Sequence, residues 1–265
     1  MNMQGKTVVL TGATGGIGRA IAHKMASQGA SLVLVSRHLD RLEALSAEMQ
    51  GQGHRELALD LATDAGRQQL VDECGGQVDI LINNAGVNAF GLLQDQSPEI
   101  VRTAMAVNAL APMLLVQALL PQLSQRGAVG VNVGSGYGSI GYPGYAAYSA
   151  SKFALRGFSE ALRRELADTA VRVLYLAPRA TATEMNPEHV VAMNKELGNS
   201  VDAPERVADE LMRLLARGDG SRYIGWPERF FVKLNGILPG IVDKALQKQL
   251  PVVKRSAMAA RQAGG

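Results

Sequence analysis

Residues 6–18 read Lys-Thr-Val-Val-Leu-Thr-Gly-Ala-Thr-Gly-Gly-Ile-Gly. The first six form a β-branched, apolar run that predicts a buried strand, and apolar residues at helical spacing follow the glycines. Glycines between a strand and a helix let the backbone approach a pyrophosphate, which the positive end of the helix dipole attracts. The stretch therefore predicts a dinucleotide site, and a glycine loop that only packs the strand on the helix is the alternative. The candidate contacts are Gly12, Thr14, Gly15, Gly16, Ile17 and Gly18.

Strand and helix patterns alternate along the rest of the chain. Short apolar runs predict further strands over residues 31–35, 55–59, 78–82, 128–133, 171–176 and 223–224. Amphipathic stretches between them predict helices over residues 39–49, 63–74, 97–123, 146–168 and 204–215. This alternation is typical of an α/β protein. It predicts a doubly wound, Rossmann-like parallel sheet of about seven strands with helices on both faces.

The second predicted strand ends in Ser36-Arg37. In such sheets an acidic residue at this point binds the ribose 2′-hydroxyl of NAD, whereas an arginine accommodates the 2′-phosphate of NADP. The nearest acidic residue, Asp40, falls in the first turn of the next predicted helix. Because a guanidinium fork suits a phosphate, Arg37 favours NADP. A solvated arginine that only ends the strand is the alternative.

Two further loops should face the same ligand, because ligands bind at the carboxyl ends of parallel strands. Asp60 and Leu61 lie at the tip of the third predicted strand, which places them near the adenine. Asn83, Ala85 and Gly86 belong to the turn Asn83-Asn84-Ala85-Gly86 after the fourth predicted strand. Small residues in this turn allow a ligand to approach the backbone closely.

The stretch 135–152 carries the residues with the clearest chemistry. Tyr148 and Lys152 are four residues apart, so on a helix they share one face. A tyrosine has a pKa of about 10, which a nearby ammonium, helped by a second cation, lowers toward neutrality. Such a phenol can give a proton to a carbonyl oxygen or take one from an alcohol, and Ser135 can hold the same oxygen. A Tyr-Lys pair on the surface of an amphipathic helix is the alternative.

Asn108 is a polar residue in the middle of the long helix predicted over residues 97–123. A buried amide needs hydrogen-bond partners. Pro112 has no N–H, so the Asn108 carbonyl loses its helical hydrogen bond. This break favours a functional role for Asn108, and an asparagine that satisfies a neighbouring strand is the alternative.

Composition narrows the class of protein. With 265 residues, 47% of them hydrophobic and 19% charged, the chain has an ordinary globular composition. Its single cysteine excludes an internal disulfide, no Cys/His cluster has zinc spacing, and no metal site is expected. No signal peptide or apolar run of membrane-spanning length is apparent, so we expect a reducing, cytoplasmic location. The net charge is only +3, without a basic stripe in the main body, so nucleic acid is not expected as a partner.

These motifs together resemble those of the short-chain dehydrogenase/reductase (SDR) family. The resemblance covers roughly residues 5–225, and it implies a Rossmann-like domain that binds a nicotinamide cofactor. It also implies a dimer or tetramer formed through the predicted helices 97–123 and 146–168. The motifs stand in the family's order and spacing as Thr11-Gly12-x-x-x-Gly16-x-Gly18, Asn83-Asn84-Ala85-Gly86, Asn108, Ser135 and Tyr148-Ser-Ala-Ser-Lys152.

The resemblance implies a role for each member of a catalytic tetrad. Tyr148 is the acid/base and Ser135 holds the substrate oxygen. Lys152 binds the nicotinamide ribose and lowers the tyrosine pKa, and the oxidised nicotinamide is the second cation near the phenol. Asn108 anchors a water that relays protons to Lys152.

The same resemblance covers the cofactor contacts. Asp60 matches the family's acidic residue on the adenine, and Asn83 and Ala85 match its cofactor-lining turn.

One segment departs from the family pattern. Where the family has Pro-Gly after the sixth strand, this chain has Pro178-Arg179. Arginine lacks the backbone freedom of glycine and adds a cation, and one hypothesis is that Arg179 holds an acidic substrate. Pro178, Thr181 and Thr183 are candidate cofactor contacts, and either threonine can match the one that the family uses.

Residues 182–203 lie where the family places a mobile substrate lid. Their apolar face suggests an apolar substrate, which can be lipid-like, steroid-like or aliphatic, and ordinary packing is the alternative. The residues of this face are Met185, Val190, Val191, Met193 and Leu197.

Residues 226–265 follow the expected SDR domain of residues 1–225 as an amphipathic extension. Seven lysines and arginines against two acidic residues give the extension a net charge of +5. Apolar residues recur at helical spacing, and Pro239-Gly240 predicts two short helices joined by a bend, with disorder from about Ser256. Residues 227–255 can lie on an anionic membrane, which makes the protein peripheral to it. The alternative is that they cover the substrate pocket or a subunit interface.

We therefore expect an NADP-dependent oxidoreductase that interconverts a ketone or aldehyde with an alcohol, with Tyr148 as general acid/base and an apolar substrate. One alternative is a 3-oxoacyl-carrier-protein reductase, which needs a basic docking patch near its active-site entrance. Another is a catalytically idle, NADP-binding regulator, against which the complete tetrad argues.

Overall fold

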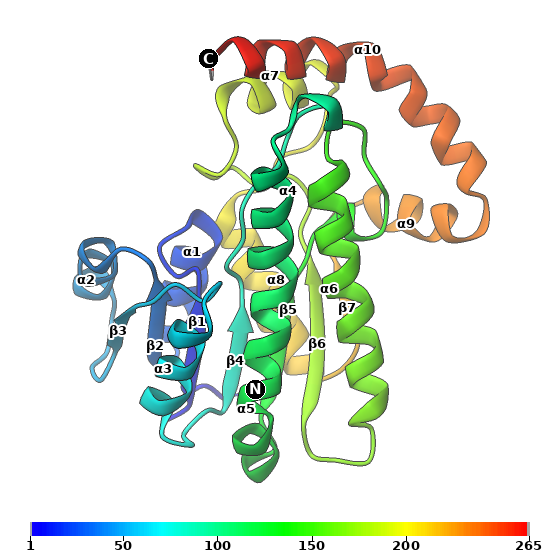
Figure 1. Ribbon diagram of the computed structural model, residues 1–265. Helices are drawn as coiled ribbons and strands as arrows, with labels where there is room; N and C mark the ends of the chain where they lie inside the picture. The colour runs from blue at the N-terminus through cyan, green and yellow to red at the C-terminus, as the bar shows by residue number, and fades with distance from the viewer. Residues whose placement is uncertain (1, 264–265) are drawn as a thin grey trace.

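The computed structural model describes residues 2–263 and confirms the α/β fold with one seven-stranded parallel sheet (Figure 1). The strand order is β3-β2-β1-β4-β5-β6-β7, so the chain starts in the middle of the sheet and winds outward in both directions. The order reverses between β1 and β4, and ligands of such sheets bind at the carboxyl edge beside this point. The strands are β1 (Thr7–Thr11), β2 (Ser31–Ser36), β3 (Arg55–Ala58), β4 (Ile80–Asn83), β5 (Val129–Val133), β6 (Arg172–Ala177) and β7 (Ser221–Tyr223).

Helices cover both faces of the sheet, as the alternating pattern predicted. Successive residues of a strand point to opposite faces, so Val8 and Leu10 of β1 join one core and Val9 joins the other. Both faces are therefore apolar, as expected for a buried parallel sheet. One face is covered by α1 (Gly16–Ala26), α2 (Leu39–Glu48) and α8 (Pro204–Arg217), and the other by α3 (Asp64–Cys74), α5 (Ala111–Arg126) and α6 (Ala146–Glu165).

The long helix predicted over residues 97–123 is continuous but not uniform. It begins at the Ser97 cap, whose hydroxyl accepts from the N–H of Ile100, and runs as α4 (Pro98–Met105) into a π-helical turn, Ala106–Leu110, and then α5. Asn108 lies in that turn, four residues before Pro112. Because Pro112 cannot donate to the Asn108 carbonyl, the helix widens locally, as π-turns do at functional sites.

By length and composition alone, Pro98–Arg126 is also apolar enough to cross a membrane, with a mean hydropathy of 1.7. No other helix within residues 2–263 meets that test. One side of the helix is packed in the core of the sheet, where Leu115, Leu119 and Leu123 are at most 1% exposed. This packing is typical of a core helix.

Three helices lie at the carboxyl edge of the sheet: α7 (Glu188–Glu196), α9 (Glu228–Ile237) and α10 (Pro239–Ala263). The predicted bend before Pro239 is present, but α10 has 25 residues and is not short. Figure 1 shows α10 crossing over α7, where Val253 and Ala257 are buried. This contact orders the chain beyond Pro251, so the disorder predicted from about Ser256 is wrong as far as Ala263. Residues 264–265 lie outside the described part of the chain.

Asp79 ties together the amino edge of the sheet at the start of β4. Its carboxylate accepts from the N–H of Thr7 at 2.9 Å and from Lys6 and Arg126 at 3.2 Å each. Burial alone raises the pKa of Asp79, but these hydrogen bonds outweigh it and hold the pKa below its ordinary value of 3.8. The folded state therefore favours the charged carboxylate.

We predict that Asp79→Asn lowers the free energy of unfolding by about 1–3 kcal/mol at neutral pH, because it removes charge-assisted hydrogen bonds from a buried acceptor. A depressed pKa gives stability that is present above the unfolded pKa and is lost as pH falls through the folded value. The difference between variant and parent should therefore shrink below pH 3.8. Urea titrations at neutral and acid pH measure it. Asp219→Asn, which alters an exposed ion pair with Arg217, is the control and should change little.

Candidate active site

Two adjoining cavities, each of about 330 Å³, open at the carboxyl edge of the sheet. The first lies over the glycine turn, and the second lies under α7, α9 and α10. The cavities meet at the five residues that line both of them, which are Ile17, Gly134, Tyr148, Thr183 and Met185. Tyr148, the predicted acid/base, therefore faces both cavities.

The glycine turn fits a ligand phosphate. Gly12 has φ +64°, and a Cβ there would lie 2.7 Å from the Cα of Ala85. A Cβ at Gly18 would lie 2.1 Å from the Gly12 carbonyl oxygen, so both positions require glycine. Helix α1 begins after Gly15 without a side-chain cap, which leaves its first N–H groups for an anion. The predicted contacts Gly12, Thr14, Gly15, Gly16, Ile17 and Gly18 all line the first cavity.

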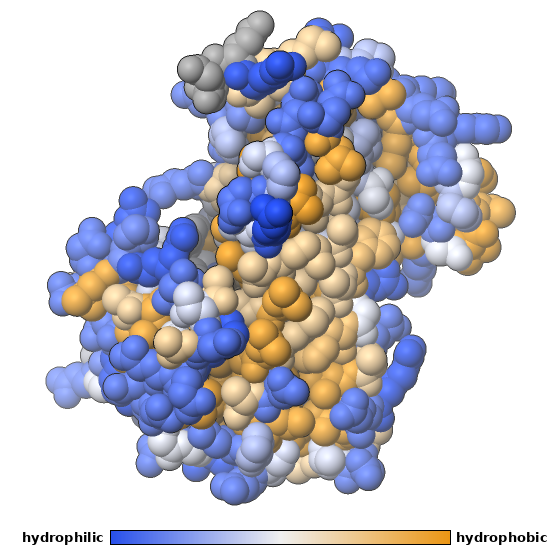
Figure 2. Space-filling view, in the orientation of Figure 1, coloured by the Kyte–Doolittle hydropathy of each residue, from blue (hydrophilic) through white to orange (hydrophobic). Residues whose placement is uncertain are grey.

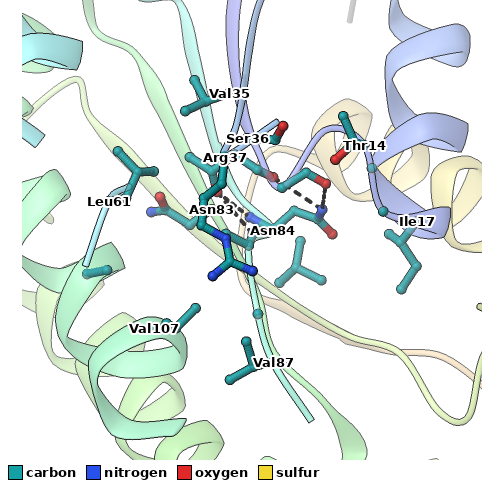
Figure 3. Close-up of a pocket in the computed structure, with 18 of the residues that line it drawn as sticks. Thr14, Ile17, Val35, Ser36, Arg37, Leu61, Asn83, Asn84, Val87 and Val107 are labelled. Carbon is teal, nitrogen blue, oxygen red and sulfur yellow. Dashed lines mark hydrogen bonds between the residues drawn. The ribbon is translucent and has the colours of Figure 1, made fainter. Parts of the chain in front are cut away.

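Hydrogen bonds lock the glycine turn to the loop after β4. Thr11 Oγ1 accepts from the N–H groups of Asn84 and Ala85, at 3.0 Å each. Asn84 Nδ2 in turn donates to the carbonyl oxygens of Thr11 at 3.2 Å and Gly12 at 3.0 Å (Figure 3). Neither Thr11 nor Asn84 was among the predicted contacts, although both belong to the quoted motifs.

The predicted adenosine-binding residues Arg37, Asp60 and Leu61 also line the first cavity, and Figure 3 shows Arg37 and Leu61 there. Asp60 Oδ1 accepts from the N–H of Ala62 at 2.9 Å, so part of its hydrogen-bonding capacity serves its own loop. Arg41, in the first turn of α2, is a second cation in the wall and was not predicted. Arg37 lies before α2, so no helical spacing relates the two arginines, and only their nearness in sequence could have indicated Arg41.

The residues beyond the loop after β4 complete the first cavity. Asn83, Ala85 and Gly86 line it as predicted. Further lining residues were not predicted, among them Val87, Val107 and Pro112. Val107 belongs to the π-turn and Pro112 to α5, and no sequence motif indicates that this part of the helix lines the cavity.

Three of the four tetrad residues meet at the junction of the cavities. Ser135 follows β5 and lines the second cavity, Lys152 lines the first, and Tyr148 lines both. The Lys152 Nζ donates to the Val133 carbonyl oxygen at 3.2 Å and lies 5.8 Å from the centre of the Tyr148 ring. Tyr148 and Lys152 are thus on one face of α6, as their spacing predicted. Within residues 2–263, no cluster of three metal-ligating side chains is present.

Burial dominates the protonation of this pair. It raises the pKa of Tyr148, and a hydrogen bond with the Ser135 hydroxyl only partly opposes it. Burial also lowers the pKa of Lys152 to about 8. The pKa of Tyr148 is therefore raised rather than lowered as the sequence suggested, because desolvation outweighs the hydrogen bond with Ser135. Burial thus favours the protonated phenol.

Asn108 is fully buried and lines neither cavity. Its amide accepts from the Val87 N–H at 2.8 Å and donates to the Val87 carbonyl oxygen at 3.0 Å and to Ser151 Oγ at 3.1 Å. Ser151 Oγ donates to the Tyr148 carbonyl oxygen at 2.7 Å. The Asn108 side chain therefore joins the loop after β4 to α6, the helix that carries Tyr148, and it does not bind a neighbouring strand as the alternative supposed.

The segment after β6 differs from the prediction. Pro178 and Thr181 line the second cavity, and the Thr181 hydroxyl donates to the Arg179 carbonyl oxygen at 3.0 Å. Thr183 borders both cavities, and its Cγ2 would lie 2.7 Å from a Cβ at Gly16. Thr183 is therefore the threonine that faces the glycine turn, while Thr181 is taken up by its own backbone.

Arg179 does not present a free cation to a substrate. Its guanidinium donates to Asp202 at 2.8 and 3.0 Å and to Glu228 at 3.2 Å, and its side chain is 11% exposed. Two carboxylates occupy its donors, which removes the basis of the acidic-substrate hypothesis. Arg179 instead connects β6, the end of the lid and the start of α9.

Aromatic residues and the C-terminal helices wall the second cavity. Tyr137 stacks on Tyr142 with ring centres 4.8 Å apart, and the Tyr142 hydroxyl donates to Gln249 of α10 at 2.6 Å. From the lid, Val190 and Met193 are buried in the cluster that holds Val253 of α10, so much of the predicted apolar face is ordinary packing. The tail supplies part of the cavity wall, in agreement with the alternative that residues 227–255 cover a pocket. Its lining residues include Phe231, Val232, Val242, Ala245 and Leu246.

Curated relatives are similar to this chain at moderate identity. The mouse (Mus musculus) protein "Dehydrogenase/reductase SDR family member 7B" is 36% identical over 207 residues, which is 74% of this chain and 64% of that protein. A "3-oxoacyl-[acyl-carrier-protein] reductase" from Bos taurus is 36% identical over 206 residues, 75% of this chain and 86% of that protein. The chain therefore spans just under two thirds of the mouse relative's length and most of the cattle one.

We predict that Gly12→Ala weakens NADPH binding at least about tenfold, because the left-handed backbone costs a non-glycine residue about 1–3 kcal/mol and the new Cβ meets Ala85. Fluorescence titration with NADPH measures the affinity, and a thermal melt confirms that the variant is folded. Gly141→Ala is the control, since a Cβ there meets nothing within 4 Å. Equal affinities for NADPH in Gly12→Ala and the parent would contradict a nucleotide site at this turn.

Family and structural comparisons agree with the geometry. The family described as "short chain dehydrogenase" matches residues 6–193. A short-chain dehydrogenase from Sphingobium yanoikuyae in complex with NADPH superposes with TM-score 0.77 and 28% identity, over 90% of this chain and 95% of that one. A short-chain dehydrogenase/reductase from Burkholderia phymatum in complex with NAD gives TM-score 0.79 and 26% identity, over 89% and 94%. The chain therefore belongs to the short-chain dehydrogenase family.

Proposed function

We propose that this protein is an NADP-dependent oxidoreductase that interconverts an apolar ketone or aldehyde with its alcohol. The observation that carries the proposal is the position of Tyr148 at the junction of the two cavities, one lined by a phosphate-binding turn and the other by aromatic and aliphatic side chains. A substrate carbonyl in the second cavity meets the phenol there, beside the bound dinucleotide.

Tyr148 and Ser135, at the junction of the cavities, have different roles toward the carbonyl oxygen of the substrate. The nicotinamide, when bound, supplies the hydride to the carbonyl carbon. Tyr148 donates its phenolic proton to the carbonyl oxygen, and the Ser135 hydroxyl holds that oxygen by a hydrogen bond. The raised pKa of Tyr148 keeps this proton in place until a substrate arrives. In the reverse direction, a cation close to the phenol is needed to make it a base.

The preference for NADP is supported by the end of β2. Arg37 and Arg41 both line the first cavity there, whereas Asp40 is not among the described residues that line it. Two guanidinium groups suit a 2′-phosphate, and no carboxylate at this point competes for a ribose 2′-hydroxyl. The solved relatives bind either dinucleotide, NADPH in one and NAD in another, so the preference depends on these two arginines.

The substrate class follows from the second cavity. Aromatic and aliphatic side chains are the largest group in its walls, and they are interspersed with polar side chains such as Asn194, Asn199 and Gln249. A pocket of about 330 Å³ with such walls suits a medium-sized apolar molecule with one carbonyl group. Burial of this apolar surface, rather than charge, supplies the affinity.

A 3-oxoacyl-carrier-protein reductase is the second candidate, because the cattle relative carries that name and a basic surface is present. Arg229, Lys233, Lys244 and Lys248 are exposed on α9 and α10, which wall the second cavity. An acidic carrier protein could bind there. The two candidates differ in whether free apolar carbonyl compounds are good substrates.

We also propose a cytoplasmic homodimer or homotetramer. Large apolar side chains are exposed on α4, the π-turn, α5 and α6, which form the broad apolar face in the middle of Figure 2. Such a face is typical of a subunit interface. The exposed members are Ile100, Leu110, Leu114 and Phe153.

We predict that Tyr148→Phe lowers kcat for carbonyl reduction by about 10²–10⁴-fold and leaves NADPH binding nearly unchanged, because only the proton donor is lost. NADPH absorbance with a panel of apolar aldehydes and ketones measures turnover. Tyr223→Phe is the matched control, since its hydroxyl contacts Ser139 at 3.0 Å outside both cavities. Unchanged turnover in Tyr148→Phe would contradict the proposed mechanism. A fully active cellular phenotype in the same variant would favour the idle regulator.

We predict that Arg37→Ala raises the dissociation constant for NADPH about 10–100-fold and leaves that for NADH unchanged, because charge-assisted hydrogen bonds to the 2′-phosphate are lost. Arg41→Ala should act in the same direction. Arg102→Ala, at a side chain that is 72% exposed, is the control. Equal weakening of NADPH and NADH by Arg37→Ala would overturn the proposed preference.

A further inference from the structure

An apolar surface, which we call the apolar tip, extends from the residue before α9 along this helix to the start of α10. Figure 2 shows orange side chains at the right edge of the view, where Figure 1 places the end of α9 and the start of α10. Trp226 and Ile237 are 74% and 77% exposed, which is unusual for side chains of this size. We define the tip as Trp226, Phe230, Phe231, Ile237, Leu238 and Ile241.

The tip points outward because the other side of α9 is attached to the body. Asn235 donates to the Ser139 carbonyl oxygen at 3.0 Å, and Glu228 is held by Arg179. Phe230 and Ile237 are seven residues apart, so they share the opposite face of α9, and Trp226 directly precedes the helix. The rings of Trp226 and Phe230 lie 6.0 Å apart and form one continuous surface.

Cations surround the tip. Arg229, Lys233, Lys244 and Lys248 are exposed, and none of them forms a salt bridge within residues 2–263. Ile241, Lys244 and Lys248 follow one another at spacings of three and four, so the lysines extend along α10 from the apolar tip. The acids between residues 226 and 250 are Glu228, which pairs with Arg179, and Asp243.

The combination of exposed apolar side chains and cations favours one kind of binding partner over another. A second copy of the chain would bring the same cations face to face, which opposes association. An anionic phospholipid surface instead attracts the lysines and accepts the apolar side chains between its headgroups. Long lysine side chains can reach the headgroups while the apolar residues below them enter the interface.

We propose that the apolar tip docks this protein on an anionic phospholipid bilayer, from which the second cavity receives its substrate. Phe231 belongs both to the tip and to the cavity wall, and Val232 and Val242 continue that wall inward. An apolar compound dissolved in the bilayer reaches Tyr148 along this surface without crossing bulk water. The delivery step rests on the proposed carbonyl chemistry, whereas the docking step does not.

The docking is tested by sedimentation of the full-length protein with vesicles of phosphatidylcholine, alone or mixed with phosphatidylserine. The parent should bind the mixed vesicles, and more weakly as salt rises. A triple variant of Trp226→Ser, Ile237→Ser and Ile241→Ser should lose at least about tenfold in affinity. A variant with Lys233→Gln, Lys244→Gln and Lys248→Gln should lose a similar factor on the mixed vesicles.

A control variant changes three exposed apolar side chains elsewhere on the surface. Leu93→Ser, Val191→Ser and Met258→Ser alter side chains that are 61%, 55% and 59% exposed, and binding should persist. The proposal is overturned if the parent does not bind the mixed vesicles, or if the control loses binding as much as the tip variant. It is also overturned if the tip variant changes only the oligomeric state, or if the lysine variant loses only reduction of a carrier-protein-bound 3-oxoacyl group.

A second readout separates docking from the oxidoreductase proposal. The tip residues Trp226, Ile237 and Ile241 line neither cavity, so the tip variant should reduce a water-soluble aldehyde with NADPH as fast as the parent. With an apolar ketone dissolved in mixed vesicles, the tip variant should be at least about tenfold slower. Vesicle binding without turnover of any carbonyl compound would leave docking standing and refute the carbonyl chemistry. Turnover without vesicle binding would do the reverse.

Discussion

The hydrogen bonds between Thr11 and Asn84 are the constraint on which the site depends. They hold the end of β1 against the loop after β4, at the point where the strand order reverses. The same loop continues to Val87, whose N–H and carbonyl oxygen both form hydrogen bonds with the Asn108 side chain. The same side chain also donates to Ser151 on α6. These hydrogen bonds, together with the chain between Asn84 and Val87, thus fix the glycine turn relative to the helix that carries the phenol. Each contact satisfies a group that would be costly to bury alone.

The C-terminal helices α9 and α10 close one side of the second cavity, whose other walls lie at the carboxyl edge of the sheet. Without α9 and α10, the second cavity would lack the wall that Phe231, Val242 and Leu246 provide. The contact between Tyr142 and Gln249 and the packing of Val253 against the lid join this wall to the active-site aromatics. The extension is therefore part of the wall of the second cavity, and its outer surface is both apolar and basic.

Local signals explain why much of the fold was predictable. Strands, the glycine turn, the Tyr148–Lys152 pair and the break at Asn108 each depend on residues close in sequence, so spacing and residue type were sufficient. Long-range features were not. Helix α10 persists past Pro251 because Val253 and Ala257 are buried against α7, and no local pattern reveals that partner. The tyrosine pKa depends on desolvation by residues from several elements, which spacing cannot measure.

Arg179 couples residues 182–203 to the C-terminal extension. Its guanidinium bridges Asp202, at the end of the first segment, and Glu228, at the start of the extension. Because both carboxylates pair with the same mostly buried cation, a shift of one segment changes the electrostatic surroundings of the other. The two segments therefore set the shape of the second cavity jointly, and a rearrangement of either one is transmitted to the opposite wall.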